Sequence, residues 1–247
     1  MPDNDTEPEA RSGPRAAAPA DYDVLRFNRT RVRTAAHMVR SKAVSPHTLC
    51  AVEVDYIHVD RVRRAAKLTC LPFTAKAVAT ALRDFPHVNA SVVDDSLHVY
   101  RRVNLGIAID IGADGLVVPV VHDADAKSVA AIAREIADLA ARARAKKLTL
   151  DDFDGGTFTI TNPGPFGTLI SGPIINQPQV AILSTDGIRK RPVVVETSGT
   201  DDEIAVHPVG NLSLSFDHRA FDGAYAARFI GRIKQILEEA PIWEVDT

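Results

Sequence analysis

Hydrophobic positions along this chain follow a helical period in some stretches and an alternating period in others. Over residues 128–147, apolar side chains recur every three or four positions behind Ser128, a candidate N-cap, which predicts the clearest helix of the sequence. A second helix is predicted over residues 72–85, with Pro72 at an early position, and a last one from about Ala224 to Glu239.

Short apolar runs that are typical of strands separate these helices. Residues 116–123 are mostly apolar, as in a buried strand, but Pro119 predicts a sheet edge or a bulge there. Residues 96–111 divide into a short and a longer strand, and residues 203–208 and 211–216 are predicted as a pair of strands. The other predicted strands cover residues 50–59, 157–162, 180–183 and 192–196. This alternation of strands and helices predicts an α/β domain.

The first 42 residues differ in character from the rest. Residues 1–23 hold four prolines, an Ala-rich stretch and six acidic side chains, so we expect a disordered tail there. Residues 24–42 carry six arginines and lysines and no acid, and much of this segment is predicted to be helical. Its basic side chains form either a solvated face or a contact with phosphate or another subunit.

Composition narrows the possible functions of the 247-residue chain. Hydrophobic residues make up 45% and charged residues 25%, as in a globular domain, and a net charge of −3 argues against nucleic acid as a partner. Cys50 and Cys70 form neither a CxxC pair nor a disulfide framework, and the sequence shows no metal-type ligand cluster. Without a signal sequence or a membrane-length apolar run, we expect a soluble, cytoplasmic protein.

The turn before the last predicted helix carries the candidate chemistry. The strand stops at Phe216, and the turn holds Asp217, His218, Arg219 and Asp222. A histidine at a strand end stands on a rigid support and titrates close enough to neutral pH to take and return a proton. A lone histidine near a turn is more often structural, however, and Asp222 could simply cap the last helix.

The same residues carry a family resemblance. His218, Asp222 and Gly223 match the His-x-x-x-Asp-Gly motif of the dihydrolipoamide acyltransferase catalytic domains of 2-oxo acid dehydrogenase complexes, a motif shared with chloramphenicol acetyltransferases. The chain also resembles the first family, in the right order, at LPFTAKAVATAL, VNLGIAIDIGADGLVVPVV and GGTFTITNPGPFGTLISGPIINQPQVAIL. The resemblance covers roughly residues 24–239, and the chain is identified as a member of that family.

The resemblance implies a fold and a set of partners. Residues 24–247 would form a chloramphenicol-acetyltransferase-like α/β domain, a two-layer sandwich of mixed β-sheet and helices. Such domains form homotrimers with the active site in a channel between neighbouring subunits. Coenzyme A or acyl-CoA would enter from one end as a substrate, and a dihydrolipoyl arm from another domain or chain would enter from the other end. The decarboxylase and dihydrolipoamide dehydrogenase subunits of such a complex are further expected partners.

The resemblance also gives roles to single residues. His218 would be the base that deprotonates the attacking thiol, and Thr161 would stabilise the oxyanion across the trimer interface. Without the motif, Thr161 would be read as an ordinary β-branched strand residue. Asp222 would orient the active-site loop, through either a hydrogen bond near the histidine or an ion pair with an arginine. Two residues are expected to help bind the coenzyme. Arg31 would contact a phosphate, and Asn162 would shape the turn next to Thr161.

The chain departs from the family pattern at both ends. Only about 23 residues precede the domain, so we expect neither a lipoyl domain nor a peripheral-subunit-binding domain. The chain is then either a core cut from a longer protein or, the reading that we favour, a stand-alone relative. The last residues, EEAPIWEVDT, lack the apolar segment with which family members join trimers into cubic cores. We therefore expect assembly to stop at the trimer.

The leading hypothesis is an acyltransferase between dihydrolipoamide and coenzyme A, as part of or related to a 2-oxo acid dehydrogenase complex. Two alternatives stay open. The first is a stand-alone coenzyme A-dependent acyltransferase with a small-molecule acceptor, and the second is a catalytically idle trimeric scaffold. Acetyl, succinyl and branched-chain groups are not distinguished by the sequence.

Overall fold

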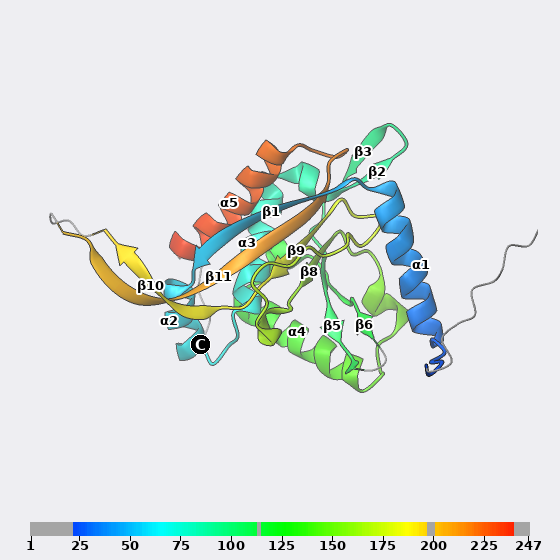
Figure 1. The fold of residues 1–247 in the computed structure, drawn as a ribbon, viewed down its shortest axis with the longest axis horizontal. Coiled ribbons are helices and arrows are strands. Elements are labelled where there is room, and N and C mark those ends of the chain that lie inside the picture. The colour runs from blue at the N-terminus through cyan, green and yellow to red at the C-terminus, as the bar shows by residue number, and fades with distance from the viewer. Residues whose placement is uncertain (1–21, 113–114, 197–200, 240–247) are drawn as a thin grey trace, which may run out of the picture.

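A computed structural model of the chain describes residues 22–112, 115–196 and 201–239 (Figure 1). Its helices are α1 (Arg29–Val44), α2 (Ile57–Ala65), α3 (Leu71–Asp84), α4 (Val129–Arg144) and α5 (Gly223–Glu239). Its strands are β1 (His47–Asp55), β2 (Ala90–Val93), β3 (Ser96–Val99), β4 (Leu105–Ile107), β5 (Ile109–Asp110), β6 (Leu116–Val117), β7 (Val120–Val121), β8 (Phe158–Thr161), β9 (Ala181–Thr185), β10 (Arg189–Val195) and β11 (Glu203–Asp217).

Seven of these strands form one mixed sheet. Its order is β1-β11-β9-β8-β4-β7, and β10 pairs with the first part of β11 outside that path. β8 runs parallel to both β4 and β9, whereas the other pairs are antiparallel. β2–β3 and β5–β6 form two small separate hairpin sheets. The described residues thus confirm an α/β fold with a mixed sheet.

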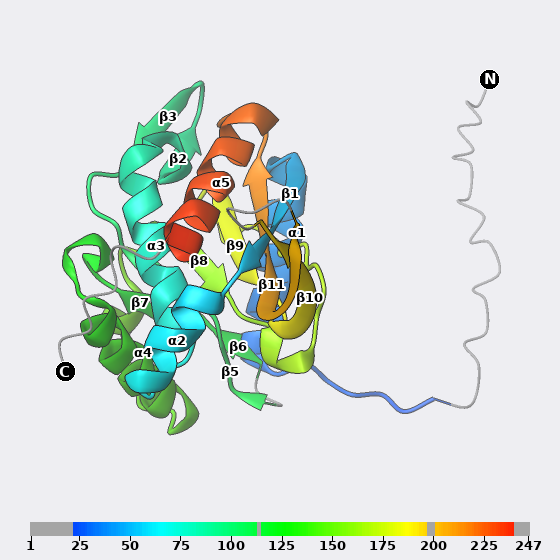
Figure 2. The ribbon, with the colours of Figure 1, turned by 90° about the vertical axis from the view of Figure 1, so that its left-hand side faces the viewer.

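The helices α2, α3, α4 and α5 cover one face of this sheet (Figure 2). α3 is buried along most of its length, and α5 turns Phe229, Ile230, Ile233 and Leu237 toward the core, as its amphipathic spacing predicts. The apolar side chains of β11 and β9 that face these helices include Leu212, Leu214, Phe216 and Leu183. The hydrophobic core therefore lies between the sheet and this helical layer.

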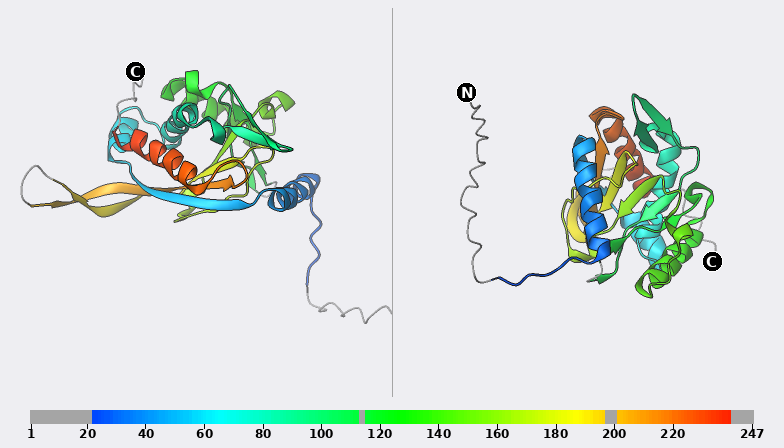
Figure 3. Two further views of the ribbon diagram at one scale, coloured as in Figure 1. Left: turned by 90° about the horizontal axis from the view of Figure 1, so that it is seen from above. Right: turned by 90° about the vertical axis from the view of Figure 1, so that its right-hand side faces the viewer.

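The opposite sheet face carries several hydroxyl side chains. Thr159, Ser184, Ser213 and Ser215 are buried there, and Thr161 is half-buried. The loop 162–180 and helix α1, which lies apart from the helical layer, border this side (Figure 3). Because hydroxyl groups seldom serve only to fill a core, this face is where chemistry is to be sought.

Two predicted elements were wrong in extent. The predicted strand over residues 50–59 ends at Asp55, because the Asp55 carboxylate accepts a hydrogen bond from the Ile57 amide and α2 begins there. The predicted pair 203–208 and 211–216 is a single 15-residue strand, β11. Pro208 and Gly210 do not interrupt it, because β11 changes partner there, from β10 to β1.

Other predictions from the sequence are confirmed. Ser128 caps α4 by accepting a hydrogen bond from the Ala131 amide at 3.2 Å. Pro119 separates β6 from β7, and β7 is the edge strand of the large sheet. The predicted tail and the C-terminal segment lie almost wholly outside the described residues, although residues 22–28 are exposed and form neither helix nor strand. Within the described part of the chain, no helix has the length and apolarity needed to cross a membrane.

Candidate active site

His218 follows directly after the last residue of β11, as the sequence predicts. Its backbone amide donates a hydrogen bond of 3.1 Å to the carbonyl of Pro46, which precedes β1. Its ring lies 5.8 Å from the ring of the buried Phe216, measured between centroids, and its side chain is exposed. The fold therefore holds the backbone of His218 firmly and presents its imidazole at the end of the sheet.

An ion pair between its two neighbours fixes this turn. Asp217 is 1% exposed, and its carboxylate accepts hydrogen bonds from the Arg219 side chain at 2.6 and 3.0 Å and from the Arg219 amide at 2.9 Å. Burial by itself would raise the pKa of Asp217, but hydrogen bonds from Arg219 and Ser45 outweigh it and hold the pKa below its ordinary value. Asp217 is therefore charged at neutral pH.

Asp222 caps α5 in this structure. Its carboxylate accepts a hydrogen bond of 3.0 Å from the Tyr225 amide, the N-cap arrangement that shields an otherwise unpaired helix donor. Of the two interactions considered from the sequence, the ion pair with an arginine is not seen among the described residues, because the nearby Arg219 is held by Asp217. Within one chain, Asp222 orders the segment after His218 through the helix that it caps.

Thr161 lies at the other end of the sheet, in the wall of a cavity of about 420 Å³. Aliphatic residues form much of this cavity, and helix α1 closes one side of it with Arg33, His37 and Met38. The Nε2 atom of His37 is buried and has no hydrogen-bond partner among the described residues. A donor at Thr161 would therefore act in a largely apolar surrounding, where one hydrogen bond stabilises charge more strongly than in water.

The structure does not bring Thr161 and His218 together within one chain. Thr161 pairs with Ser184 on β9, and Ser184 pairs with Ser213 on β11. His218 lies five residues beyond Ser213, which corresponds to roughly 17 Å along the strand direction, and two strands away. The two side chains thus belong to opposite ends of the sheet.

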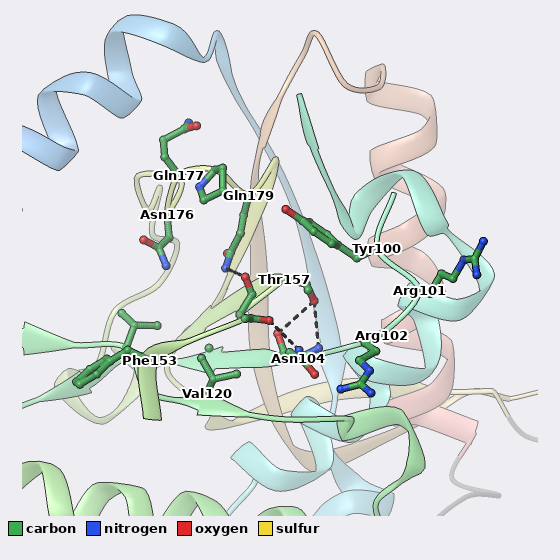
Figure 4. A pocket seen from close by; sticks show the side chains of 15 residues that line it. Tyr100, Arg101, Arg102, Asn104, Val120, Phe153, Thr157, Asn176, Gln177 and Gln179 are labelled. Atoms are coloured by element: carbon green, nitrogen blue, oxygen red, sulfur yellow. Dashed lines mark hydrogen bonds between the residues drawn. The ribbon is translucent and has the colours of Figure 1, made fainter. Parts of the chain in front are cut away.

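A second cavity of about 600 Å³ lies at the His218 end (Figure 4). Gln179 in its wall precedes Val180, whose carbonyl accepts a hydrogen bond from the Asp217 amide. Asn104 and Thr157, also in the wall, are held by hydrogen bonds to each other. Both cavities share Val118 and Asn176, so they adjoin.

Of the two residues predicted to contact the coenzyme, Asn162 lines neither cavity, whereas Arg31 lines a small cavity that shares Thr34 and Leu116 with the Thr161 cavity. Asn162 lines a separate cavity with Cys70 and Asp186, and its side-chain oxygen lies against Gly164, which fits a role in shaping that turn. Arg31 is exposed in the first turn of α1, beside a small cavity that contains Asp110. Among the described residues, neither side chain forms a hydrogen bond or an ion pair with Thr161 or His218.

Asp217 and Arg219 are the residues of the site whose role sequence reasoning missed. Both stand in the turn that the sequence singles out, so the signal was a charged pair on either side of the candidate base. Only the structure shows that the Asp217 carboxylate is buried and that it forms an ion pair with Arg219 on the other side of His218.

Replacing Asp217 by Asn should loosen the turn and remove an acid-sensitive contribution to stability. Because the folded-state pKa of Asp217 is lowered, the stabilisation is present above the ordinary carboxyl pKa and is lost as pH falls through the lowered value. We expect Asp217→Asn to be destabilised by about 1–3 kcal/mol at pH 7 and by less in acid. Denaturant unfolding between pH 3 and 7 measures this, and an equal loss at every pH would contradict it.

Comparison with known proteins now defines the family. The model of the 2-oxoacid dehydrogenases acyltransferase (catalytic domain) family matches residues 19–243, a range that contains both Thr161 and His218. The chain belongs to this family. A chloramphenicol acetyltransferase, 14% identical with a TM-score of 0.53 over 82% of this chain and 94% of its own, shares the fold, so the predicted fold class is confirmed.

Similar family members come from several bacteria. The lipoamide acyltransferase component of the branched-chain alpha-keto acid dehydrogenase complex of Bacillus subtilis is 40% identical over 94% of this chain and 56% of its own length. The chain thus spans about half of that relative. A probable dihydrolipoamide acetyltransferase structure from Listeria monocytogenes is 42% identical, with a TM-score of 0.83 over 92% of this chain and 98% of its own.

A third similar protein has been studied for its mechanism. It is the Azotobacter vinelandii dihydrolipoamide acetyltransferase, 34% identical with a TM-score of 0.82 over 88% of this chain and 91% of its own. That study concerned the role of a serine, a histidine and an asparagine in catalysis, and the histidine and asparagine stand four positions apart.

Proposed function

We propose that this acyltransferase domain transfers an acyl group between a dihydrolipoyl thiol and the thiol of coenzyme A. The observation that carries the proposal is the family match over residues 19–243, which includes His218 and Thr161. The lipoyl group comes from another domain or chain, and the decarboxylase and dihydrolipoamide dehydrogenase of a 2-oxo acid dehydrogenase complex are the proposed partners. A cytoplasmic location stays a prediction.

His218 is the proposed general base. The neutral imidazole takes the proton of the attacking thiol, and the thiolate sulfur bonds to the carbonyl carbon of the thioester. When the tetrahedral intermediate collapses, the bond to the departing sulfur breaks and the imidazolium returns the proton to that sulfur. The rigid end of β11 and the Asp217–Arg219 pair support this role, because a base must be held in one orientation.

Thr161 is the proposed oxyanion donor, acting on a site whose base comes from a neighbouring subunit. The negative oxygen of the intermediate accepts a hydrogen bond from the Thr161 hydroxyl. The separation of the two residues within one chain supports a shared site, since they lie at opposite ends of the sheet. We propose a homotrimer, in which each chain gives one residue to each of two sites.

Asp222 is proposed to position the segment around His218 rather than to touch the substrate. The histidine and asparagine named in the Azotobacter vinelandii study are four positions apart, as His218 and Asp222 are. The N-cap hydrogen bond from Tyr225 to Asp222 gives this role a physical basis in the present chain. A carboxylate accepts that bond as an asparagine side chain can.

The two adjoining cavities suit two thiol carriers that approach from different sides. One lies toward the His218 end of the sheet and the other contains Thr161, and Val118 and Asn176 belong to both. Contacts of the coenzyme with Arg31 and Asn162 remain proposals. Both can be tested by substitution with alanine and titration of coenzyme A.

Turnover with a panel of acyl-CoAs, with free dihydrolipoamide or an amine or alcohol as the acceptor, tests the proposed function and identifies the acyl group. The similar proteins are named for different acyl groups, one for a branched-chain alpha-keto acid dehydrogenase complex and another for acetyl transfer. Transfer to dihydrolipoamide from any acyl-CoA of the panel would support the proposal. Transfer only to amines or alcohols would favour a small-molecule acceptor, and no transfer at all would favour a scaffold.

We predict that the protein assembles as a trimer, because a single chain lacks a complete site. Light scattering at micromolar concentration should give the mass of three 26.7 kDa chains. A monomer with full activity would contradict the shared site. A stable shell of many trimers would instead show that the expectation drawn from the last residues, which lie outside the described ranges, was wrong.

A further inference from the structure

A buried hydroxyl without a partner stands beside the proposed oxyanion donor. Ser184 on β9 is 0% exposed, and its Oγ atom has no hydrogen-bond partner among the described residues. Burying a hydroxyl that makes no hydrogen bond lowers the stability of a fold, and an alanine in its place would not carry that cost. The presence of this hydroxyl therefore calls for an explanation other than the folding of the chain.

The strand register places the Ser184 hydroxyl next to Thr161. β8 and β9 run parallel, and Thr161 is paired with Ser184 across them. Neighbouring strands lie roughly 5 Å apart, and paired residues point to the same face of a sheet. Ile182, two residues before Ser184, lines the cavity that contains Thr161, so Ser184 points to that side as well. The two hydroxyls are therefore within reach of one hydrogen bond.

The neighbour on the other side of Ser184 leaves its hydroxyl free for Thr161. Ser213 on β11 is paired with Ser184, but the Ser213 hydroxyl donates a hydrogen bond of 3.1 Å to the buried Asp186 carboxylate. Asp186 also accepts hydrogen bonds from the amide and the hydroxyl of Ser171, at 3.2 and 2.6 Å. Because a hydroxyl has a single proton, Ser213 has none to give to Ser184. The Ser184 hydroxyl can thus donate its own proton toward Thr161.

A threonine is a better oxyanion donor when its own oxygen accepts a hydrogen bond. The Thr161 hydroxyl has one proton and two lone pairs, so it can donate to the oxyanion and accept from a second hydroxyl at the same time. The second hydrogen bond polarises the first, most strongly in a surrounding of low dielectric constant such as the largely aliphatic wall of this cavity. Because a hydrogen bond to a charged oxygen is about twice as strong as one between neutral groups, the Thr161 proton turns to the oxyanion rather than to Ser184.

We propose that Ser184 is a positioning residue, whose hydroxyl donates a hydrogen bond to the Thr161 oxygen while Thr161 donates to the tetrahedral intermediate. Each proton stays on its own oxygen, and no covalent bond is made or broken at Ser184. This inference rests on the proposed function, in which Thr161 stabilises the oxyanion. It adds the residue that orients the Thr161 hydroxyl and strengthens its hydrogen bond.

Ser184→Ala tests this role with two measurements. Steady-state kcat should fall about three- to tenfold with little change in KM, because the hydrogen bond to Thr161 acts mainly in the transition state. The thermal unfolding temperature should stay the same or rise, because the substitution removes a buried hydroxyl that has no partner in the folded chain. An unchanged kcat together with a lower unfolding temperature would overturn the proposal, since the hydroxyl would then serve the fold.

Ser184→Cys separates the hydrogen bond from packing. A thiol fills the place of the hydroxyl but is a weak donor, so kcat should fall as it does in Ser184→Ala. Wild-type kcat in the cysteine variant would assign Ser184 a packing role instead. The matched control is Ser215→Ala, since Ser215 is a buried serine on the same sheet face that pairs with Ile182. This control should keep wild-type kcat, and an equal loss there would overturn a specific role for Ser184.

A double-mutant cycle with Thr161→Val identifies the partner of Ser184. Valine keeps the shape of Thr161 and has no oxygen, so Ser184→Ala should lower kcat no further in that background, whereas independent losses would overturn the proposal. The cycle also separates this inference from the proposed function. Unchanged kcat in Thr161→Val alone would remove the oxyanion donor, and the role of Ser184 with it. A large loss in Thr161→Val with no loss in Ser184→Ala would overturn only the role of Ser184.

Discussion

His218→Ala is expected to lower kcat by about 100-fold or more, while coenzyme A still binds. The imidazole is the proposed acceptor of the thiol proton, and its loss leaves water to perform that step. Because the side chain is exposed at the end of β11, its removal leaves no cavity in the core. Steady-state turnover gives kcat, and calorimetric titration of coenzyme A tests binding.

His98→Ala is the matched control, since His98 is an exposed histidine on β3 outside the proposed site. It should retain wild-type turnover. Near-normal kcat in His218→Ala would remove the proposed mechanism, and loss of coenzyme binding in that variant would point to a different role for the residue.

Thr161→Ala is expected to lower kcat by about 100-fold with little change in KM, because the lost hydrogen bond forms mainly in the transition state. Thr161→Ser keeps the hydroxyl and should retain much more activity. Thr161→Val keeps the shape of the side chain and removes the donor, so it should resemble Ala.

The three variants together distinguish a hydrogen bond from packing. Thr161 is half-buried in the wall of a cavity, so a packing role would make Val the mildest change and would make Ala and Ser equally harmful. Circular dichroism and thermal unfolding should show that all three variants fold.

The sequence predicted correctly those helices and strands that are determined by interactions between residues close together in the chain. The helix after Ser128 has an N-cap and a regular apolar spacing, and both are as expected. The end of β1 was missed because Val, Tyr and Ile favour strands, whereas the buried Tyr56 and the hydrogen bond from Ile57 to Asp55 end the strand there. Where β1 ends therefore depends on tertiary packing, which the strand propensities of single residues do not predict.

The candidate site was also predicted only in part, because some of its features depend on tertiary packing. The motif identified His218, and β11 does end directly before it. The capping role of Asp222 was weighed from the sequence, and the structure shows it. The ion pair of Asp217 with Arg219 depends on burial of the Asp217 carboxylate. The sequence alone does not show whether Asp217 or Asp222 is the buried acid.

In the proposed trimer, the separation of Thr161 from His218 gives each chain two half-sites. Chains with His218→Ala and chains with Thr161→Ala should each be nearly inactive alone, but a mixed trimer would pair an intact threonine of one chain with an intact histidine of another. Random mixing in equal amounts should restore roughly a quarter of the wild-type activity, since each half-site is intact with even odds. Restored activity in the mixture would mean that catalysis belongs to the boundary between chains.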